Sequence, residues 1–187
     1  MAIRDDGGQL DVSEDIKVRA AQAGDIAAMQ AFLFEHGANQ WNFLPEPEVA
    51  AHLGAIADGR TQAVLAEQGG QLLGFVTFLG ARSMVRYQSR EHLGYPHGYV
   101  CEAVVHREHS GKGLGSRLLD AAVEQLRARG FREVYIERHE ENLASAGMMR
   151  KAGFVEVESF ADPARRFSGS RRTTVCRIVF DSASPRA

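Results

Sequence analysis

The chain alternates between two hydrophobic periods, one typical of strands and one typical of helices. Residues 16–20 alternate apolar and polar side chains, which predicts a half-buried strand. Within residues 25–37 the apolar side chains recur at a helical spacing and share one face, which predicts a helix. A second, shorter helix carries Val49, Leu53 and Ile56 on one side. One strand and two helices therefore open the predicted fold.

A hairpin and a long polar connection come next. Residues 61–67 and 71–79 are apolar strand candidates, and the Gln-Gly-Gly turn at residues 68–70 is a strong hairpin signal. The polar connection at residues 80–97 is longer than a hairpin turn requires. Long connections of this kind are often functional, so we expect it to cap a site.

The second half of the chain continues with strands and helices in alternation. The expected elements are strand 99–105, helix 114–129, strand 131–138, helix 142–152, and strands 154–160 and 173–180. The order β-α-α-β-β-β-α-β-α-β-β predicts a single α/β domain over residues 15–181. Residues 1–14 are interpreted as a flexible lead-in and residues 182–187 as a tail, because both are polar and poor in large apolar groups.

Composition narrows the class of protein. At 187 residues with 44% hydrophobic residues, one domain with a substantial core is the default. The net charge of −2 gives no reason to expect nucleic acid or an anionic membrane as a partner. The sequence shows neither the apolar core of a secretory signal nor a run of about 18 apolar residues. With Cys101 and Cys176 interpreted as reduced packing residues, a cytoplasmic location is predicted.

A glycine-rich segment between a predicted strand and a predicted helix indicates an anion site. Gly111, Gly113 and Gly115 alternate there, so the backbone can approach a ligand closely at the positive end of the helix dipole. Two common phosphate loops do not match: position 106 is His where the P-loop requires Gly, and Ser116 stands where the dinucleotide fingerprint requires Gly or Ala. A tight strand-to-helix turn that binds nothing is the alternative.

Two segments resemble the GCN5-related N-acetyltransferase (GNAT) superfamily. Residues 105–115 are similar to its acetyl-coenzyme A segment, Q/R-x-x-G-x-G/A after a strand, with Ser110 in place of Gln or Arg. Residues 142–154 are similar to its N-x(6)-Y-x-x-x-G-F helix, with Met149 in place of Tyr. Two motifs in the right order are far more specific than either alone.

The resemblance implies a fold and a cofactor. The fold is a central, mostly antiparallel mixed sheet of six to seven strands flanked by helices, with a splayed strand pair that holds acetyl-CoA. The glycine loop would wrap the pyrophosphate of coenzyme A, and the pantetheine arm would lie between the splayed strands. Asn142 is similar to a residue that contacts this arm, and an N-cap is an equally physical role. The implied cofactor residues are Val104, Val105, Ser110, Gly111, Lys112, Gly113, Leu114, Gly115, Ser116, Asn142 and Met149.

The implied chemistry is direct transfer of an acetyl group to an amine. An amine of pKa about 10.4 is mostly protonated at neutral pH, so a general base is expected. Glu102 is the best candidate, because it is the only acid in an otherwise apolar strand, although such a residue can also simply face solvent. Met149 cannot donate a proton as the family Tyr does, which leaves Ser145, Tyr135 or solvent to protonate the thiolate.

The acceptor is less defined by the sequence. Arginines gather in the long connection and before the last strand, which hints at an acceptor with an anionic group, such as an amino acid; a solvated loop is the alternative. The candidate acceptor residues are Arg82, Arg86, Tyr99 and Arg166. We therefore predict a small-molecule amine acceptor, with a protein or peptide N-acetyltransferase and a CoA-binding regulatory module without turnover as alternatives. Dimers are frequent among similar proteins, so a homodimer is one expectation for the oligomeric state.

Overall fold

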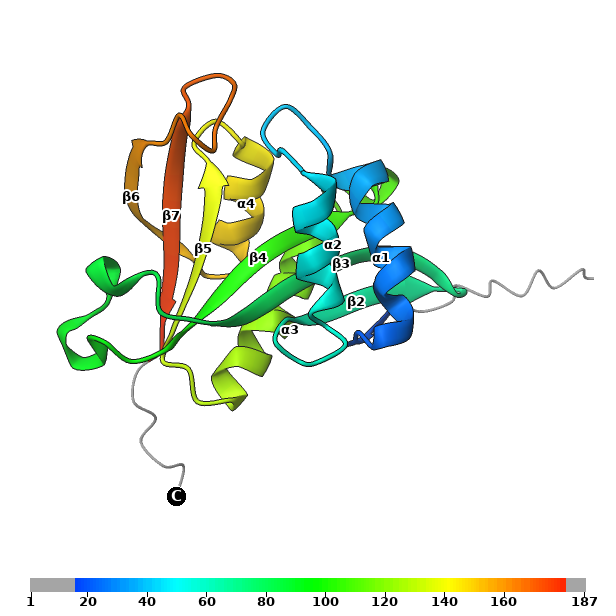
Figure 1. The fold of residues 1–187 in the computed structure, drawn as a ribbon, viewed down its shortest axis with the longest axis horizontal. Helices are drawn as coiled ribbons and strands as arrows, with labels where there is room; N and C mark the ends of the chain where they lie inside the picture. Colours follow the sequence, from blue (N-terminus) through cyan, green and yellow to red (C-terminus); the bar gives the residue numbers. More distant parts are fainter. Residues whose placement is uncertain (1–15, 181–187) are drawn as a thin grey trace, which may run out of the picture.

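A computed structural model describes residues 16–180 as one seven-stranded sheet flanked by four α-helices (Figure 1). The expected lead-in at residues 1–14 and the tail at 182–187 lie outside the described residues. The strands are β1 (Lys17–Ala20), β2 (Gln62–Gln68), β3 (Gln71–Ala81), β4 (His97–Val105), β5 (Glu133–His139), β6 (Val155–Ala161) and β7 (Arg172–Val179). The helices are α1 (Ile26–Phe32), α2 (Glu46–Gly54), α3 (Leu114–Ala128) and α4 (Leu143–Lys151). The predicted order and fold class are confirmed.

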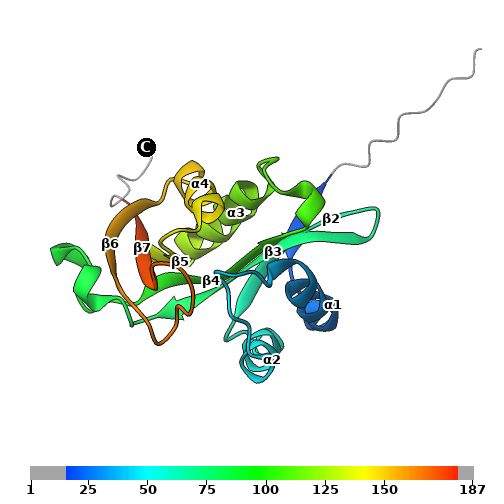
Figure 2. The same cartoon turned by 90° about the horizontal axis from the view of Figure 1, so that it is seen from above.

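The sheet order is β1-β2-β3-β4-β5-β7-β6, and its two faces are covered by different pairs of helices. Helices α1 and α2 lie on one face, and α3 and α4 lie on the other (Figure 2). Two hydrophobic clusters correspond to these layers. One contains the buried residues of α1 and α2, and the other contains those of α3 together with Met149 of α4. The sheet is therefore buried on both sides along its middle strands.

Helix α3 forms where the sequence places apolar residues at helical spacing. Leu118, Leu119 and Leu126 are fully buried against the sheet, and each contributes about 2 kcal/mol through removal of apolar surface from water. The helix begins after Gly113 and ends before Gly130, and both glycines have positive φ. The core-facing stripe of α3 fixes the position of the glycine loop that precedes it.

The pairing of β4 with β5 is parallel and short. Only Gly98, Tyr99 and Val100 of β4 have register partners in β5, namely Val134, Tyr135 and Ile136. Every other neighbouring pair in the described sheet is antiparallel. Beyond these three pairs the two strands diverge, and Figure 1 shows the resulting V between them. This is the splayed strand pair that the family resemblance implies.

The long connection at residues 82–96 lies at the closed end of this V (Figure 1). The Ser89 amide donates to the Glu133 carboxylate at 2.9 Å, and the Tyr87 hydroxyl donates to Glu158 at 2.6 Å. Arg177 also donates to the Tyr87 carbonyl. The expectation that this connection caps the site is wrong, because Ser89 ties it to the end of β5 opposite to the opening and Tyr87 ties it to the edge strand β6.

Candidate active site

A cleft of about 540 Å³ occupies the open end of the V. Its walls are the diverging ends of β4 and β5, the glycine loop, the first turns of α4 and a segment that follows α1. The β4 wall is Cys101–Val105 and the β5 wall is Ile136–His139. Backbone groups of β4 beyond Val100 have no strand partner on the β5 side, so they are available to a ligand.

The glycine loop has the conformation that an anion cradle requires. Gly111 has φ +76° and Gly113 has φ +87°, values that side-chain-bearing residues rarely adopt. A Cβ atom at either position would meet nothing within 4 Å, so the surface in front of the loop is open. The first amides of α3 lie directly behind it without intrahelical partners. These residues fit a phosphate-bearing group.

The third glycine of the motif has a different role. A Cβ atom at Gly115 would lie 2.5 Å from Sδ of Met148, so Gly115 permits close contact between α3 and α4. Ser116 reinforces the same contact by donating to the Met148 carbonyl at 3.3 Å. The contact keeps the glycine loop next to the start of α4.

The predicted cofactor residues divide into two groups. Those that line the cleft are Val104, Val105, Ser110, Gly111, Gly113, Gly115, Ser116, Asn142 and Met149. Lys112 and Leu114 do not line it: Lys112 is exposed, and Leu114 is buried in the core. Most of the predicted cradle therefore converges on one cavity.

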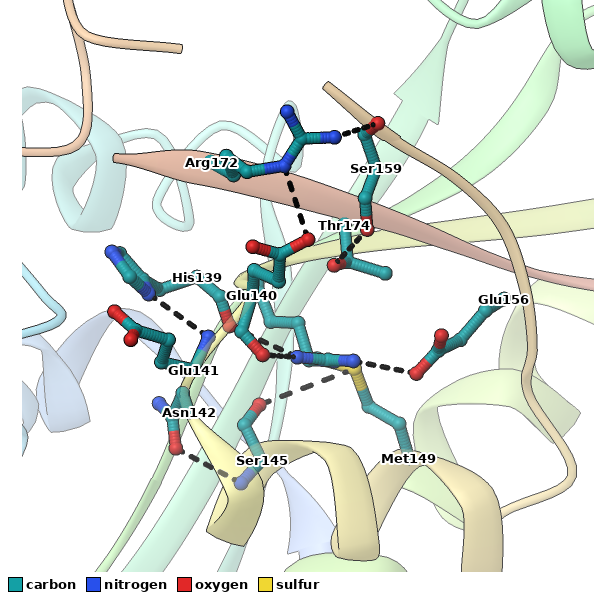
Figure 3. Close-up of polar contacts among 11 residues, drawn as sticks. His139, Glu140, Glu141, Asn142, Ser145, Met149, Glu156, Ser159, Arg172 and Thr174 are labelled. Carbon is teal, nitrogen blue, oxygen red and sulfur yellow. Dashed lines mark hydrogen bonds and ion pairs between the residues drawn. The ribbon is translucent and has the colours of Figure 1, made fainter. Parts of the chain in front are cut away.

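Asn142 lies where both of the roles expected for it, helix N-cap and contact with the cofactor, are possible. Its Oδ1 accepts the Ser145 amide at 3.1 Å, which caps the N-terminus of α4 (Figure 3). Asn142 also lines the cleft. The Ser145 hydroxyl points toward the Met149 sulfur at 4.0 Å in the same view. The start of α4 thus presents an amide and a hydroxyl to the cavity.

Glu102 lies in the β4 wall and is partly buried. Burial raises its pKa to about 7, and Asn42 and Arg166 oppose that rise by stabilising the charged form. Both of these partners line the cleft, so the carboxyl faces the cavity. A group that titrates near neutral pH can accept a proton and release it again under ordinary conditions.

Tyr135 is not brought to the cleft, although the sequence suggested it as a proton donor. Its ring is fully buried at the closed end of the V, and its hydroxyl donates to Glu133 at 2.6 Å. Burial raises the pKa of this phenol. Of the side chains proposed to protonate the thiolate, only Ser145 lies at the cavity.

Only one of the four predicted acceptor residues lines the cleft. Arg166 does so, and its Nε donates to Thr173 Oγ1 at 2.8 Å; within residues 16–180 its two terminal nitrogens form no hydrogen bond. Arg82 donates to the Gly94 carbonyl within the 82–96 connection, and Arg86 pairs with Glu158 of β6 at 2.5 Å; neither arginine lines the cleft. Tyr99 does not line the cleft itself, but its hydroxyl donates to Glu137 of the β5 wall at 2.7 Å.

Sequence reasoning missed the segment that follows α1. Trp41 and Asn42 line the cleft, and the Trp41 ring lies 4.4 Å from the ring of His139. Ser168 joins this segment to the β6–β7 loop by donating to the Gln40 carbonyl at 2.5 Å. No motif marks these residues; the only signal was a single tryptophan in a polar loop.

The fold and the cleft together define the class of protein. It has one mixed sheet that opens between two parallel strands, next to a glycine loop at the N-terminus of a helix. The chain belongs to the acetyltransferase (GNAT) family, whose model matches residues 26–154. This match confirms the predicted family and the prediction that the protein is an acyltransferase. None of the helices in residues 16–180 is long and apolar enough to cross a membrane.

Several known proteins are similar to this chain over most of its length. The L-amino acid N-acyltransferase MnaT of Escherichia coli (strain K12) is 26% identical over an alignment of 174 residues, and the match covers 89% of this chain and 95% of that protein. The structure of yncA, a putative acetyltransferase from Salmonella typhimurium with its cofactor acetyl-CoA, has a TM-score of 0.69 at 23% identity and covers 92% and 99% of the two chains. A ribosomal-protein-alanine N-acetyltransferase from Brucella melitensis has a TM-score of 0.67 at 20% identity, covering 88% and 99%.

Proposed function

We propose that the protein transfers the acetyl group of acetyl-CoA to the amine of a small molecule that also carries a carboxylate, such as an amino acid. The observation that carries this proposal is the placement of Glu102 and Arg166 on one cavity at the open end of the V. One of them can take a proton from an ammonium group, and the other can bind an anion.

The donor half of the site would be formed mainly by the backbone. Gly111, Gly113 and the first turn of α3 would hold the pyrophosphate, and β4 beyond Val100 would hold the pantetheine arm. Acetyl-CoA supplies an activated acetyl group as a thioester, whose carbon–sulfur bond breaks as the new amide bond forms. The solved relative that contains acetyl-CoA supports this choice of donor.

Glu102 would act as the general base. With a pKa of about 7, a substantial fraction of its carboxyl is ionised at neutral pH and can accept the ammonium proton of the acceptor. We expect kcat/KM to rise with pH through about 7 as this carboxyl loses its proton. Ser145, which lines the cavity, would return a proton to the departing thiolate, and solvent is the alternative.

Arg166 would bind the carboxylate of the acceptor. Its position beside the base allows one small molecule to reach both groups, as an α-amino acid requires. The similarity to an L-amino acid N-acyltransferase supports this substrate class. The segment at residues 38–42 contacts the β6–β7 loop through the hydrogen bond from Ser168 to Gln40. These two segments would bound the part of the cleft that receives the acceptor.

A peptide or protein N-terminus is a second candidate acceptor. The observation that favours it is the location of residues 82–96, which leave the cleft uncovered because they are tied to Glu133 and Glu158. The fold likeness to the ribosomal-protein-alanine enzyme is consistent with it.

The test is release of the coenzyme A thiol with matched acceptors. A panel of L-amino acids, their methyl esters and short peptides would be compared at equal concentration. We expect turnover with free amino acids and a large loss with the esters, which lack the carboxylate charge. Peptides preferred over every free amino acid would replace the first candidate by the second. Absence of thiol release with any amine, alongside measurable coenzyme A binding, would identify a binding module without turnover.

A further inference from the structure

The strand that carries Glu102 has an irregularity at that residue. In the pairing of β3 with β4, Val76 is opposite Ala103 and Phe78 is opposite Val100, so the single residue Thr77 faces two residues of β4. Such a bulge interrupts the ladder and leaves backbone groups of the longer strand without their usual partners. The Glu102 amide is one of these groups, and it donates to the Thr77 hydroxyl at 3.0 Å.

Thr77 is itself held by helix α2. It is fully buried, and its Oγ1 lies 2.8 Å from Nε2 of His52 on α2. The Thr77 oxygen already accepts the Glu102 amide, and its own proton remains to be donated. Burial lowers the pKa of His52, so the ring is neutral and Nε2 can accept that proton. The contacts form a chain from His52 through Thr77 to the backbone of Glu102.

We propose that Thr77 and His52 are positioning residues for the general base, an inference that rests on the proposed function. They replace the missing ladder bond at the bulge, and so fix the backbone from which the Glu102 side chain enters the cleft. Neither residue lines the cavity, which means that they act through Glu102 and not on a ligand. Helix α2 thereby contributes to the site from the face of the sheet that α1 and α2 cover (Figure 2).

The consequence for the reaction is specific. Loss of the hydroxyl frees the bulge to change register, and a displacement of the base by about 1 Å can cost about 100-fold in rate. The glycine loop is anchored by α3 and does not depend on this chain of bonds. We therefore expect kcat to change and the affinity for coenzyme A to stay near the wild-type value.

The experiment compares Thr77→Val, Thr77→Ser and His52→Phe. The valine variant should lose about tenfold to 100-fold in kcat, shift the midpoint of the pH–rate profile, and bind coenzyme A as the wild type does. The serine variant should restore both quantities, because it retains the hydroxyl. The phenylalanine variant should move kcat and the profile in the same direction by a smaller factor.

The matched control is Thr174→Val, since Thr174 is a buried threonine of the same sheet whose hydroxyl pairs with Ser159 at 2.6 Å. It should lower stability without changing the pH profile. Introducing Thr77→Val into a Glu102→Gln background should cause no further loss of rate. A wild-type kcat and profile in both Thr77→Val and His52→Phe would overturn the inference. An active Glu102→Gln enzyme would instead overturn the proposed base.

Discussion

The two halves of the β4–β5 pair have opposite properties. In the closed half, Tyr99 and Val100 pair with β5 in register, and Glu133 ties the 82–96 connection to the sheet. In the open half, the strands part and their ends form the walls of a cleft about 540 Å³ in volume. Both halves contain a carboxylate on the sheet. Glu133 is satisfied by three neighbours, whereas Glu102 has its pKa raised by burial to about 7.

The difference between Glu133 and Glu102 shows what hydrogen-bond partners do to the pKa of a carboxyl on the sheet. In the closed half the donors Tyr135, His92 and the Ser89 amide lower the pKa of Glu133 against the effect of burial. The group then remains charged and serves structure. In the open half burial dominates over fewer opposing contacts, so the carboxyl of Glu102 titrates near neutral pH. The same residue type becomes a stabilising group in one half and a candidate base in the other.

The largest expected effect contrasts these two carboxylates. Glu102→Gln removes the base and should lower kcat/KM by about 100-fold or more, measured by thiol release. Glu133→Gln should leave kcat/KM near the wild-type value but lower the free energy of unfolding by about 1–3 kcal/mol, because hydrogen bonds to a buried group are lost. If the two variants exchange these phenotypes, the division of roles between the halves is wrong.

The next effect concerns the donor side of the open half. Gly113→Asp places strain, bulk and negative charge in the cradle, and should weaken coenzyme A binding by about 100-fold in a calorimetric titration. Gly59→Asp is the matched control, because Gly59 also has a positive φ and nothing within 4 Å of a Cβ atom. Equal binding by both variants would exclude the loop from the cofactor site.

A third effect is on stability and depends on pH. The folded protein raises the pKa of Glu102 from 4.5 to about 7, so ionising this group costs stability as the pH rises through that window. Glu102→Gln avoids the cost and should be more stable than the wild type above pH 7, by at most about 3 kcal/mol. The advantage should vanish below pH 4.5. Urea unfolding at pH 4.5 and pH 8 measures both; equal stability at pH 8 would show that burial does not perturb Glu102.

The smallest effect separates two arginines that look alike in the sequence. Arg166→Met should raise KM for an amino acid acceptor by about tenfold through loss of a charged hydrogen bond, with little change in KM for acetyl-CoA. Arg82→Met, at the closed half, should leave both KM values unchanged, because Arg82 binds the Gly94 carbonyl. An equal rise of the acceptor KM in both variants would indicate a long-range electrostatic effect and not direct contact with the acceptor.

The local pattern of the sequence was sufficient for the elements of the fold. Apolar residues at helical spacing predicted α3, and the Gln-Gly-Gly turn predicted the β2–β3 hairpin. The glycine loop was predictable for the same reason, since its conformation depends on residues adjacent in the chain. Glu102 could be identified because a single acid in an apolar strand is conspicuous; its catalytic role stays a prediction.

The acceptor side was less predictable because it depends on where two strands separate. Tyr99 and Tyr135 belong to the three residue pairs before that point, and Arg82 and Arg86 belong to the connection at residues 82–96, which does not line the cleft. Pairing extends over three residues only, and no local pattern encodes that length. Asn42 comes to Glu102 across the fold from the segment after α1, a contact between residues far apart in the chain.

The glycine loop presents peptide groups more than side chains to the cleft, and under the proposed function this has a consequence for how such a chain can diverge. Peptide groups are the same whatever residue carries them, so exchanges such as Ser110 or Met149 alter the motif without removing the amides behind it. The proposed donor site would thus tolerate substitution at most of its positions, while the glycines with positive φ cannot vary freely. Under this proposal, binding of acetyl-CoA would be retained in relatives whose sequences no longer match the motif. The residues that line the acceptor side of the cleft could then change, and with them the substrate.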